Sequence, residues 1–254
     1  MLPVSCHYPT SNGGDHLGTQ AGVLAGRTAV SQGNSSIHRV TLAGLEVDSK
    51  LLLKFADSFK LFNFDVRLVE AESSKDGHAG AVTACVMPLN QAAVICLRNS
   101  AWFLPRRTLL YGIGDWSDAA KFSDLGINAL LEKTTHLSFR TAVSSTHTLI
   151  GRGIDEHARV PIVMSVTVKA EGITVKGITR NLGPGGMAVT LSRDASLPDV
   201  VDLDFSLPGD GPLSLRGSPR WYSGLMVGLC FEPSASTKTL RQWVSEYSQL
   251  GKQH

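Results

Sequence analysis

The stretch from Arg180 to Met187 has the composition best suited to receiving a ligand. It reads Arg-Asn-Leu-Gly-Pro-Gly-Gly-Met, so that three glycines fall within four residues and a proline stands among them. Glycine tolerates positive φ angles and lets other atoms approach the main chain, so a glycine-dense turn between two strands can serve as a ledge for a ligand. The alternative is a tight connection between strands that holds no ligand.

The sequence lacks the motifs of the common catalytic and metal sites. It contains no Gly-x-Ser-x-Gly, no phosphate loop of the type Gly-x-x-x-x-Gly-Lys-Ser/Thr and no His-Glu-x-x-His. The four cysteines are scattered without the spacing of a zinc site or a disulfide framework. We therefore expect no enzyme activity, no metal and no cofactor. Cys96 and Cys230 lie in apolar runs typical of strands and are expected to be small buried hydrophobes.

The composition predicts a folded protein of two domains without a broad electrostatic surface. Apolar residues make up 43% and charged residues 18% of the 254 residues. Lys and Arg number 24 against 22 for Asp and Glu, so we expect no nucleic-acid partner, although one or two arginines could form a local anion site. The longest apolar run is far shorter than the roughly 18 residues of a membrane span, and the N-terminus lacks a signal-peptide pattern. We expect a cytoplasmic protein with no membrane insertion.

The chain begins with a polar tail, and its first structured region alternates between strands and helices. Residues 1–37 are rich in Gly, Ser, Thr, Gln and Asn, and we expect them to be disordered. Residues 38–149 contain a helix after Asp48-Ser49 and another over 117–125 that ends at Gly126. This alternation predicts a parallel α/β sheet covered on both faces. The expected strands are Val40–Leu45, Asp65–Ala71, Ala92–Leu97, Thr108–Ile113 and Asn128–Glu132.

Residues 150–254 follow a polar linker and contain strand-like segments without intervening helices. Apolar and polar residues alternate from Val163 to Val168 and from Val201 to Phe205, and turn signals such as those at 208–211 separate the segments. Short antiparallel strands of this kind predict a six-stranded β-barrel. The expected strands are Pro161–Lys169, Thr174–Asn181, Met187–Leu191, Val200–Leu207, Leu213–Tyr222 and Leu225–Phe231.

An apolar stripe near the C-terminus predicts a final helix. Leu240, Trp243 and Val244 recur at helical spacing, and we expect this face to pack on the barrel. A Ser or Thr near 236–237 is expected to cap the start of the helix, and Gly251 to end it.

The second region resembles a PilZ domain over about residues 150–250. The resemblance rests on the joint order of Arg159-Val160-Pro161, Asn181 to Met187, Trp221, and Val227 to Phe231 before a terminal helix. It implies a six-stranded barrel that binds the bacterial second messenger cyclic di-GMP, with Trp221 and Phe231 in its core. In that family an Arg-x-x-x-Arg motif before the first strand contacts guanine and phosphate. An Asp/Asn-x-Ser-x-x-Gly motif on the turn between the second and third strands completes the site.

The family motifs match this sequence at three positions and differ at two. Arg159 matches the second arginine, Asn181 the Asp/Asn position and Gly186 the closing glycine, whereas Asp155 replaces the first arginine and Gly183 the serine. Arginine pairs with guanine edges and phosphate oxygens, so the loss of one such contact removes about 1.5–3 kcal/mol. The candidate cyclic di-GMP site that the resemblance implies therefore comprises Arg159, Asn181, Gly183 and Gly186, with Arg152 or Arg180 as a compensating cation.

The first region resembles a response-regulator receiver domain less specifically. The resemblance rests on the strand and helix alternation, on Tyr111 to Gly114, and on Leu131 to Thr134 at the end of the fifth strand. A receiver needs two acidic residues after strand one and an aspartate that ends strand three. Here strand one ends in Ala43-Gly44-Leu45 and the expected third strand in 96–99, so that only Lys133 matches. The resemblance implies a pseudo-receiver that could mediate homodimerisation or partner docking; the alternative is an unrelated α/β scaffold.

These observations support three functional hypotheses. The first is a bacterial signalling effector that binds cyclic di-GMP and passes the signal on by contact with an unidentified protein partner. The second, motivated by Asp155 and Gly183, is a ligand-independent adaptor with a non-binding barrel and a pseudo-receiver. The third is a regulator phosphorylated on aspartate; it rests only on the receiver-like outline, and we expect phosphodonor labelling to modify no aspartate.

Overall fold

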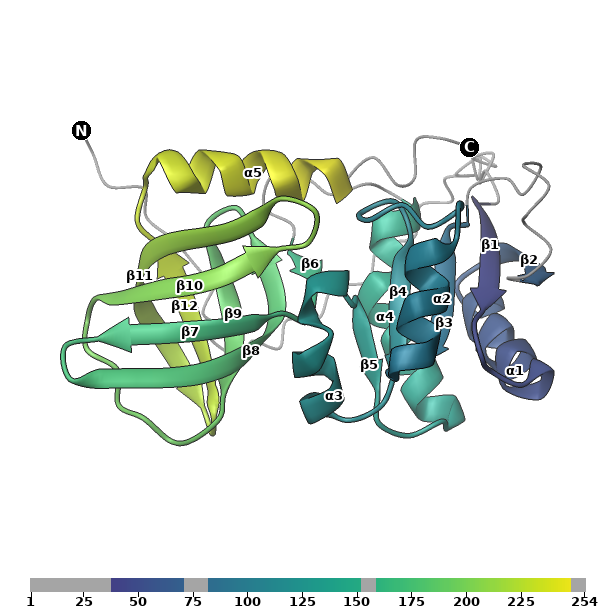
Figure 1. The fold of residues 1–254 in the computed structure, drawn as a ribbon, viewed down its shortest axis with the longest axis horizontal. Helices are drawn as coiled ribbons and strands as arrows, with labels where there is room; N and C mark the ends of the chain where they lie inside the picture. The colour runs from purple at the N-terminus through teal and green to yellow at the C-terminus, as the bar shows by residue number, and fades with distance from the viewer. Residues whose placement is uncertain (1–37, 71–81, 152–158, 248–254) are drawn as a thin grey trace, which may run out of the picture. The chain divides into compact units, whose positions relative to one another are not determined.

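The computed structural model describes residues 38–70, 82–151 and 159–247 (Figure 1). The expected disordered tail, the linker with Arg152 and Asp155, and the expected helix end at Gly251 lie outside the described residues. Within the described ranges, no helix has the length and apolar character needed to cross a membrane.

The first part of the described chain is a five-stranded parallel sheet. Its strands lie in the order β2-β1-β3-β4-β5, and every neighbouring pair is parallel. This is one of the two common strand orders of doubly wound α/β folds. The strands are β1 (His38–Gly44), β2 (Phe64–Glu70), β3 (Ala84–Pro88), β4 (Leu109–Ile113) and β5 (Ala129–Leu131).

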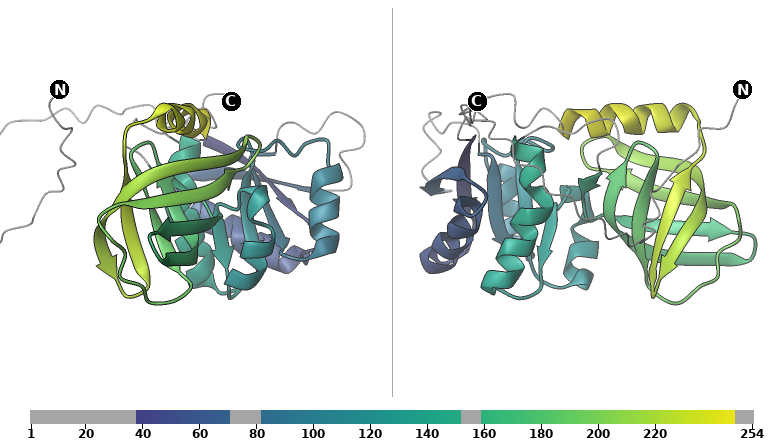
Figure 2. Two further views of the ribbon diagram at one scale, coloured as in Figure 1. Left: turned by 60° about the vertical axis from the view of Figure 1, so that its left-hand side comes forward. Right: turned by 180° about the vertical axis from the view of Figure 1, so that it is seen from behind.

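Helices cover both faces of this sheet, as the uninterrupted apolar strands predicted. Tyr111 of β4 meets Phe55 of α1 (Ser49–Lys60) edge to face at 4.8 Å between ring centres, and Phe55 meets Phe139 of α4 (His136–Gly151) at 5.4 Å. On the other face, buried residues of α2 (Gln91–Asn99) and α3 (Trp116–Lys121) share a separate apolar cluster with Leu110. Figures 1 and 2 show α2 in front of the sheet in one view and α4 in front of it in the reverse view.

The predicted third strand was wrong, because Ala92–Leu97 lies within α2 and the third strand is Ala84–Pro88. An apolar run of six residues suits a buried strand or a buried helix equally well, so its length does not decide between them. The residue before the run favours the helix, because the Asn90 side chain caps the helix start by accepting a hydrogen bond from the Ala93 main-chain N–H at 2.8 Å.

The same misassignment explains why one cysteine was placed wrongly. Cys96 is exposed on α2, whereas Cys85 is fully buried in β3, where burial raises the pKa of its thiol. Cys230 is half-buried on a barrel strand. The small buried hydrophobe that was expected at Cys96 is therefore Cys85.

The second part of the described chain is a closed antiparallel barrel. Six strands form the ring in the order β8-β7-β10-β11-β12-β9, and pairing of β8 with β9 closes it. Alternate residues face inward, so that Val201, Leu203 and Phe205 are buried and their neighbours are not. The ring consists of β7 (Ser165–Ala170), β8 (Ile173–Gly183), β9 (Gly186–Leu191), β10 (Val201–Leu207), β11 (Gly211–Ser223) and β12 (Met226–Phe231).

The segment predicted as one strand from Pro161 to Lys169 is divided in the structure. A short strand, β6 (Val160–Pro161), pairs with the end of β8, and β7 begins only at Ser165. Between them the chain leaves the barrel ladder, because the Val163 N–H donates to the main-chain oxygen of Ile127 beside β5 at 2.7 Å. The stretch thereby joins the barrel to the parallel sheet.

The C-terminal helix α5 (Ala235–Tyr247) packs on the barrel as predicted. Leu240 and Trp243 are fully buried, and the Trp243 indole N–H donates to the Pro208 main-chain oxygen at 3.1 Å. The expected cap near 236–237 was displaced, because Ser234 begins the helix by exchanging hydrogen bonds with Thr237: each residue's main-chain N–H donates to the other's hydroxyl, at 2.8 and 3.2 Å. Such reciprocal bonds satisfy donors that would otherwise lack partners at the helix start.

Candidate ligand-binding site

Arg159 and Asn181, 22 residues apart in sequence, are joined by a hydrogen bond at the start of the barrel. Arg159 immediately precedes β6, which pairs with β8 so that Val160 lies opposite Leu182 and Pro161 opposite Asn181. Arg159 Nη1 donates to Asn181 Oδ1 at 3.2 Å, and both side chains are half-buried. Two of the predicted site residues are therefore brought together by strand pairing.

A β-bulge in β8 sets the direction of the Asn181 side chain. The pairing of β8 with β9 shifts register between Thr179 and Asn181, which leaves Arg180 as the extra residue. Thr179 is buried, and its hydroxyl accepts from the Met164 N–H at 2.9 Å and donates to the Ile162 oxygen at 2.7 Å. Because a bulge redirects the side chains that follow it, Asn181 reaches Arg159 rather than the barrel interior.

The glycine-rich stretch is a two-residue hairpin turn. Gly183 ends β8 opposite Gly186 at the start of β9, so that Pro184 and Gly185 alone form the loop. None of the three glycines is among the described residues with a positive φ angle, so a left-handed backbone conformation does not explain why glycine stands at these positions. A Cβ atom on Gly186 would lie 2.3 Å from the Leu229 oxygen of β12. The protein's own main chain therefore occupies the space that this glycine leaves.

Arg180 points toward the α/β part of the chain. Its guanidinium carbon lies 3.7 Å from the centre of the Trp116 ring at the start of α3, and its Nε donates to Thr190 Oγ1 at 3.0 Å. Partial burial lowers the pKa of this guanidinium, while the nearby Glu132 carboxylate acts in the opposite direction. Arginine stays charged under such shifts, so Arg180 forms a cation–π contact.

The other predicted residues are placed as follows. Arg152 and Asp155 lie outside the described residues, so the structure does not position them. Phe231 is buried in the barrel as predicted, whereas Trp221 is only half-buried. The Trp221 ring lies over Gly228, where a Cβ atom would be 2.0 Å from its indole nitrogen. This tryptophan covers a glycine of the neighbouring strand instead of filling the barrel interior.

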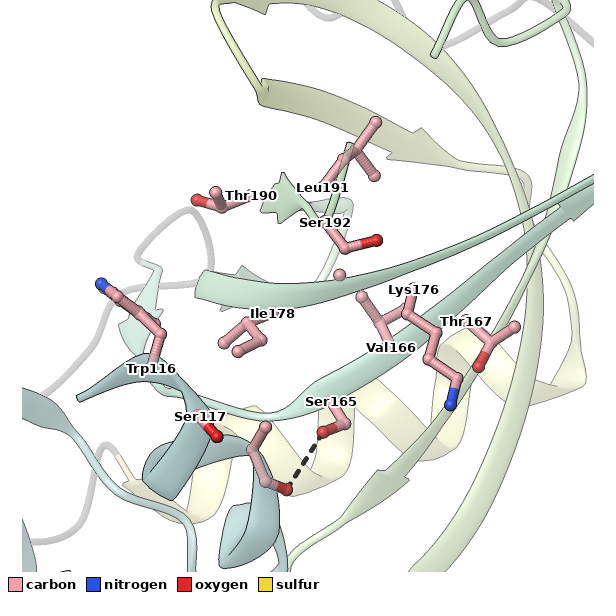
Figure 3. Close-up of a pocket in the computed structure, with 12 residues that line it drawn as sticks. Trp116, Ser117, Ser165, Val166, Thr167, Lys176, Ile178, Thr190, Leu191 and Ser192 are labelled. Carbon is pink, nitrogen blue, oxygen red and sulfur yellow. Dashed lines mark hydrogen bonds between the residues drawn. The ribbon is translucent and has the colours of Figure 1, made fainter. Parts of the chain in front are cut away.

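Two cavities border this region, and both are lined by Trp116. The first, of about 640 Å³, lies between α3 and the strands β7, β8 and β9 (Figure 3). The Ser165 hydroxyl donates to the Ala120 main-chain oxygen at 3.3 Å, and Figure 3 draws this bond as the dashed line from Ser165. The second, of about 620 Å³, runs along β5 and is called the β5 cavity below; its lining includes Trp116, Glu132, Lys133, Ser138, Pro161 and Arg180.

Sequence reasoning did not identify Trp116 or Glu132 as neighbours of the candidate site. Both follow strands of the parallel sheet, Trp116 after β4 and Glu132 after β5. The position of ligand sites beyond the carboxyl ends of parallel strands could have directed attention to them. Among the described residues, no group of three His, Cys, Asp or Glu side chains is placed to hold a metal ion.

Comparison with known proteins gives one family match and several similar structures. The family model described as the PilZ domain matches residues 155–246. The PilZ domain of CeSA from a cellulose-synthesizing bacterium is 26% identical, with 38% of this chain and 99% of that chain covered and a TM-score of 0.30. No curated protein matches the chain.

Two further solved structures are similar at lower identity. The Bacillus subtilis Inhibitor of motility (MotI/DgrA) is 18% identical, with 35% of this chain and 48% of that chain covered and a TM-score of 0.31. The Borreliella burgdorferi PlzA protein in complex with c-di-GMP is 17% identical, with 46% and 50% covered and a TM-score of 0.29. The match spans about half the length of each of these two proteins.

Proposed function

We propose that this chain, whose residues 155–246 form a PilZ domain, is a bacterial signalling effector that binds cyclic di-GMP and passes the signal on by protein contact. PilZ domains are a known class of cyclic di-GMP effector domain, and they are not enzymes. The observation that carries the proposal for this chain is the contact between Arg159 Nη1 and Asn181 Oδ1 at 3.2 Å. These two residues match the arginine and Asp/Asn positions of the family motifs.

The chemistry of this pair suits a guanine nucleotide. A guanidinium donates in parallel to guanine O6 and N7 or to phosphate oxygens, and its planar face stacks on purines. The hydrogen bond to Asn181 holds Arg159 before the ligand arrives, so less side-chain entropy is lost on binding. A charged contact of this kind contributes about 1.5–3 kcal/mol, or one to two decades of affinity.

The remaining site residues belong to the proposal with different roles. Gly183 and Gly186 flank the Pro184-Gly185 turn that follows Asn181, and their role would be to shape this turn beside the ligand, since β12 fills the space at Gly186. Arg152 and Arg180 are the cations that could replace the arginine missing at Asp155. Because Arg180 lies on Trp116, its use by a ligand would involve the α/β part as well.

The rest of the chain would carry the signal onward. We propose that residues 38–149 are a pseudo-receiver domain and that residues 150–254 are the ligand-binding domain, working together in the cytoplasm. The carboxyl end of β3 presents Pro88 and then Asn90, and an amide cannot accept a phosphoryl group as aspartate does. A pseudo-receiver would therefore act through its surfaces, on an unidentified protein partner or on a second copy of the chain.

A second candidate function is a ligand-independent adaptor. Asp155 places a carboxylate where the family has an arginine, and the Arg180 guanidinium is engaged by Trp116 and Thr190. In this alternative both parts of the chain act only through protein contacts.

Calorimetric titration of the full chain with cyclic di-GMP separates the two functions. We expect binding by the parent protein and at least tenfold weaker binding by Arg159→Ala, because the guanidinium contact is lost. The matched control is Arg67→Ala, which removes an exposed arginine from β2, the edge strand farthest from β5 in the sheet. If the parent protein does not bind cyclic di-GMP at tens of micromolar ligand, the effector function is refuted and the ligand-independent adaptor is the function that fits. If Arg159→Ala binds with the affinity of the parent, the binding site lies elsewhere in the chain.

A further inference from the structure

The β5 cavity brings a planar cation and an aromatic ring together at one wall. The Arg180 guanidinium carbon lies 3.7 Å from the centre of the Trp116 ring, and both side chains line the cavity. Trp116 is half-buried, and Arg180 is fixed by its hydrogen bond to Thr190. An indole ring with a guanidinium group over it offers surfaces for the flat face of a nucleobase, because both groups stack on purines.

Glu132 adds an acceptor that distinguishes one purine from another. It lines the same cavity, and its charge acts on Arg180, so the carboxylate lies near the stacked pair. Guanine presents two donors, N1–H and the N2 amino group, on the edge where adenine presents the acceptor N1. A carboxylate can accept both guanine donors, and it meets an unfavourable lone pair on adenine.

The charges of the cavity suit a nucleotide that carries phosphate. Its charged lining residues are Arg180, Lys133 and Glu132, so the cations outnumber the carboxylates by one. A volume of about 620 Å³ is also within the range of small-molecule sites. The hydroxyl of Ser138 adds a polar group to the same lining.

The location of these residues fits a ligand site of a doubly wound sheet. Trp116 follows the carboxyl end of β4, and Glu132 follows the carboxyl end of β5. Ligands of such sheets bind in the crevice outside the carboxyl ends of the strands. The barrel contributes Pro161 and Arg180 to the same lining, and Asn181 is both the cross-strand partner of Pro161 and the chain neighbour of Arg180.

We propose that the β5 cavity is a guanine-binding subsite in which the base stacks on the Trp116–Arg180 pair and Glu132 accepts from its N1–H and N2–H groups. The α/β part thus supplies ligand contacts of its own. The subsite depends on the proposed function only where cyclic di-GMP is the ligand, because a cyclic di-GMP molecule held by Arg159 has a second guanine that could occupy this cavity. The subsite itself requires only a guanine nucleotide.

Tryptophan fluorescence of the full chain, titrated with GMP and with AMP, tests the subsite. We expect GMP to quench the parent protein and the control Trp221→Phe, and to leave Trp116→Phe unquenched, because only Trp116 meets the base. AMP should bind the parent about tenfold more weakly than GMP. In Glu132→Gln, a conservative change of an exposed residue, we expect GMP affinity to fall about tenfold and the preference over AMP to shrink.

Three results would overturn the subsite. They are equal affinity of the parent for GMP and AMP, a GMP quench that persists in Trp116→Phe, and no GMP binding by calorimetry at about 1 mM. The comparison of the nucleotides in the parent needs no variant and so does not depend on the folding of one.

Arg159→Ala separates this inference from the proposed function. It should keep the GMP quench while its affinity for cyclic di-GMP falls. GMP binding without any cyclic di-GMP binding would support the subsite and refute the effector function. The opposite outcome would support the effector function and refute the subsite. In that case cyclic di-GMP binding would depend on Arg159 and be unchanged in Glu132→Gln, and GMP would cause no quench.

Discussion

The glycine at position 186 is required by packing inside the barrel. Gly186 lies opposite Cys230 where β9 pairs with β12, and a Cβ atom there would meet the Leu229 oxygen at 2.3 Å. Main-chain atoms cannot move aside as the end of a flexible side chain can, so the strands would have to separate. Gly185, the adjacent residue, has no atom within 4 Å of a Cβ atom and no positive φ angle.

Replacing these two glycines by alanine should therefore give opposite results. We expect Gly186→Ala to lower the free energy of unfolding by about 1–3 kcal/mol, because it forces two paired strands apart. Gly185→Ala should change it by less than about 0.5 kcal/mol. Urea unfolding monitored by circular dichroism measures both. A neutral Gly186→Ala would mean that β9 and β12 are not paired as closely as described.

Among the elements, β10 is tied to both of its neighbours by one carboxylate. Asp204 of β10 accepts from Lys169 of β7 at 2.7 Å and from Ser214 of β11 at 2.6 Å. The contact with Lys169, followed by that with Ser214, holds the pKa of Asp204 below its usual value. The Asp204–Lys169 pair is solvent-exposed, so its contribution to stability is modest and depends on salt.

Lys169→Met should raise the pKa of Asp204 toward its ordinary value. A carboxyl group with a lowered pKa in the folded state stabilises the fold above its unfolded pKa, and this contribution is lost as pH falls through the folded pKa. The parent should therefore exceed the variant in stability near neutral pH, and the difference should vanish in strong acid. Carboxyl titration by NMR checks the shift. Lys176→Met, which removes an exposed lysine from β8, should leave the Asp204 pKa unchanged.

Across the whole molecule, Arg106 joins three parts of the described chain. It precedes β4 in the α/β part, and its Nη1 donates to both carboxylate oxygens of Asp210 in the β10–β11 turn, at 3.1 and 3.2 Å. The same nitrogen lies 2.9 Å from Glu246 Oε2 of α5. The Arg106 side chain is only 20% exposed, so this pair of ion contacts is screened less than a fully exposed one.

Arg106→Ala should lower the free energy of unfolding by about 1 kcal/mol, because two carboxylates lose their common partner. Arg107→Ala is the control, since Arg107 is the adjacent, exposed arginine. Urea unfolding at low and high salt measures the effect, which should shrink as salt rises. An equal loss in the two variants would show that the junction contributes nothing specific.

Most of the fold could be predicted from patterns of apolar residues, and the failures have local causes. The barrel strands and α5 have a clear period, and a period of two or of 3.6 is a direct consequence of backbone geometry. The third parallel strand, Ala84–Pro88, was missed because the next apolar run, Ala92–Leu97, was taken as the third strand in its place. Helix α2 was mistaken for a strand because its cap, Asn90, was overlooked.

The residues of the candidate site could also be predicted only in part. Arg159, Asn181 and Gly186 could be named from sequence because they stand at fixed positions in a motif. The contact between Arg159 and Asn181, however, depends on the pairing of β6 with β8 and on the bulge at Arg180, and neither feature can be predicted from the pattern of apolar and polar residues. Trp116 belongs to no motif, and Glu132 was named only within the receiver-like stretch Leu131 to Thr134, so neither was identified as a neighbour of the site.

The order of residues was sufficient to identify a parallel α/β region, a six-stranded barrel and the resemblance of its second region to a PilZ domain, because periodicity and motif spacing are local properties. Only the folded structure brought Trp116 and Glu132 of the first part to Arg180 of the second. Side chains far apart in sequence meet when elements pack, and packing depends on how all the buried faces fit together. That fit gave the turn at Arg180 to Met187 a neighbouring cavity that the sequence did not predict.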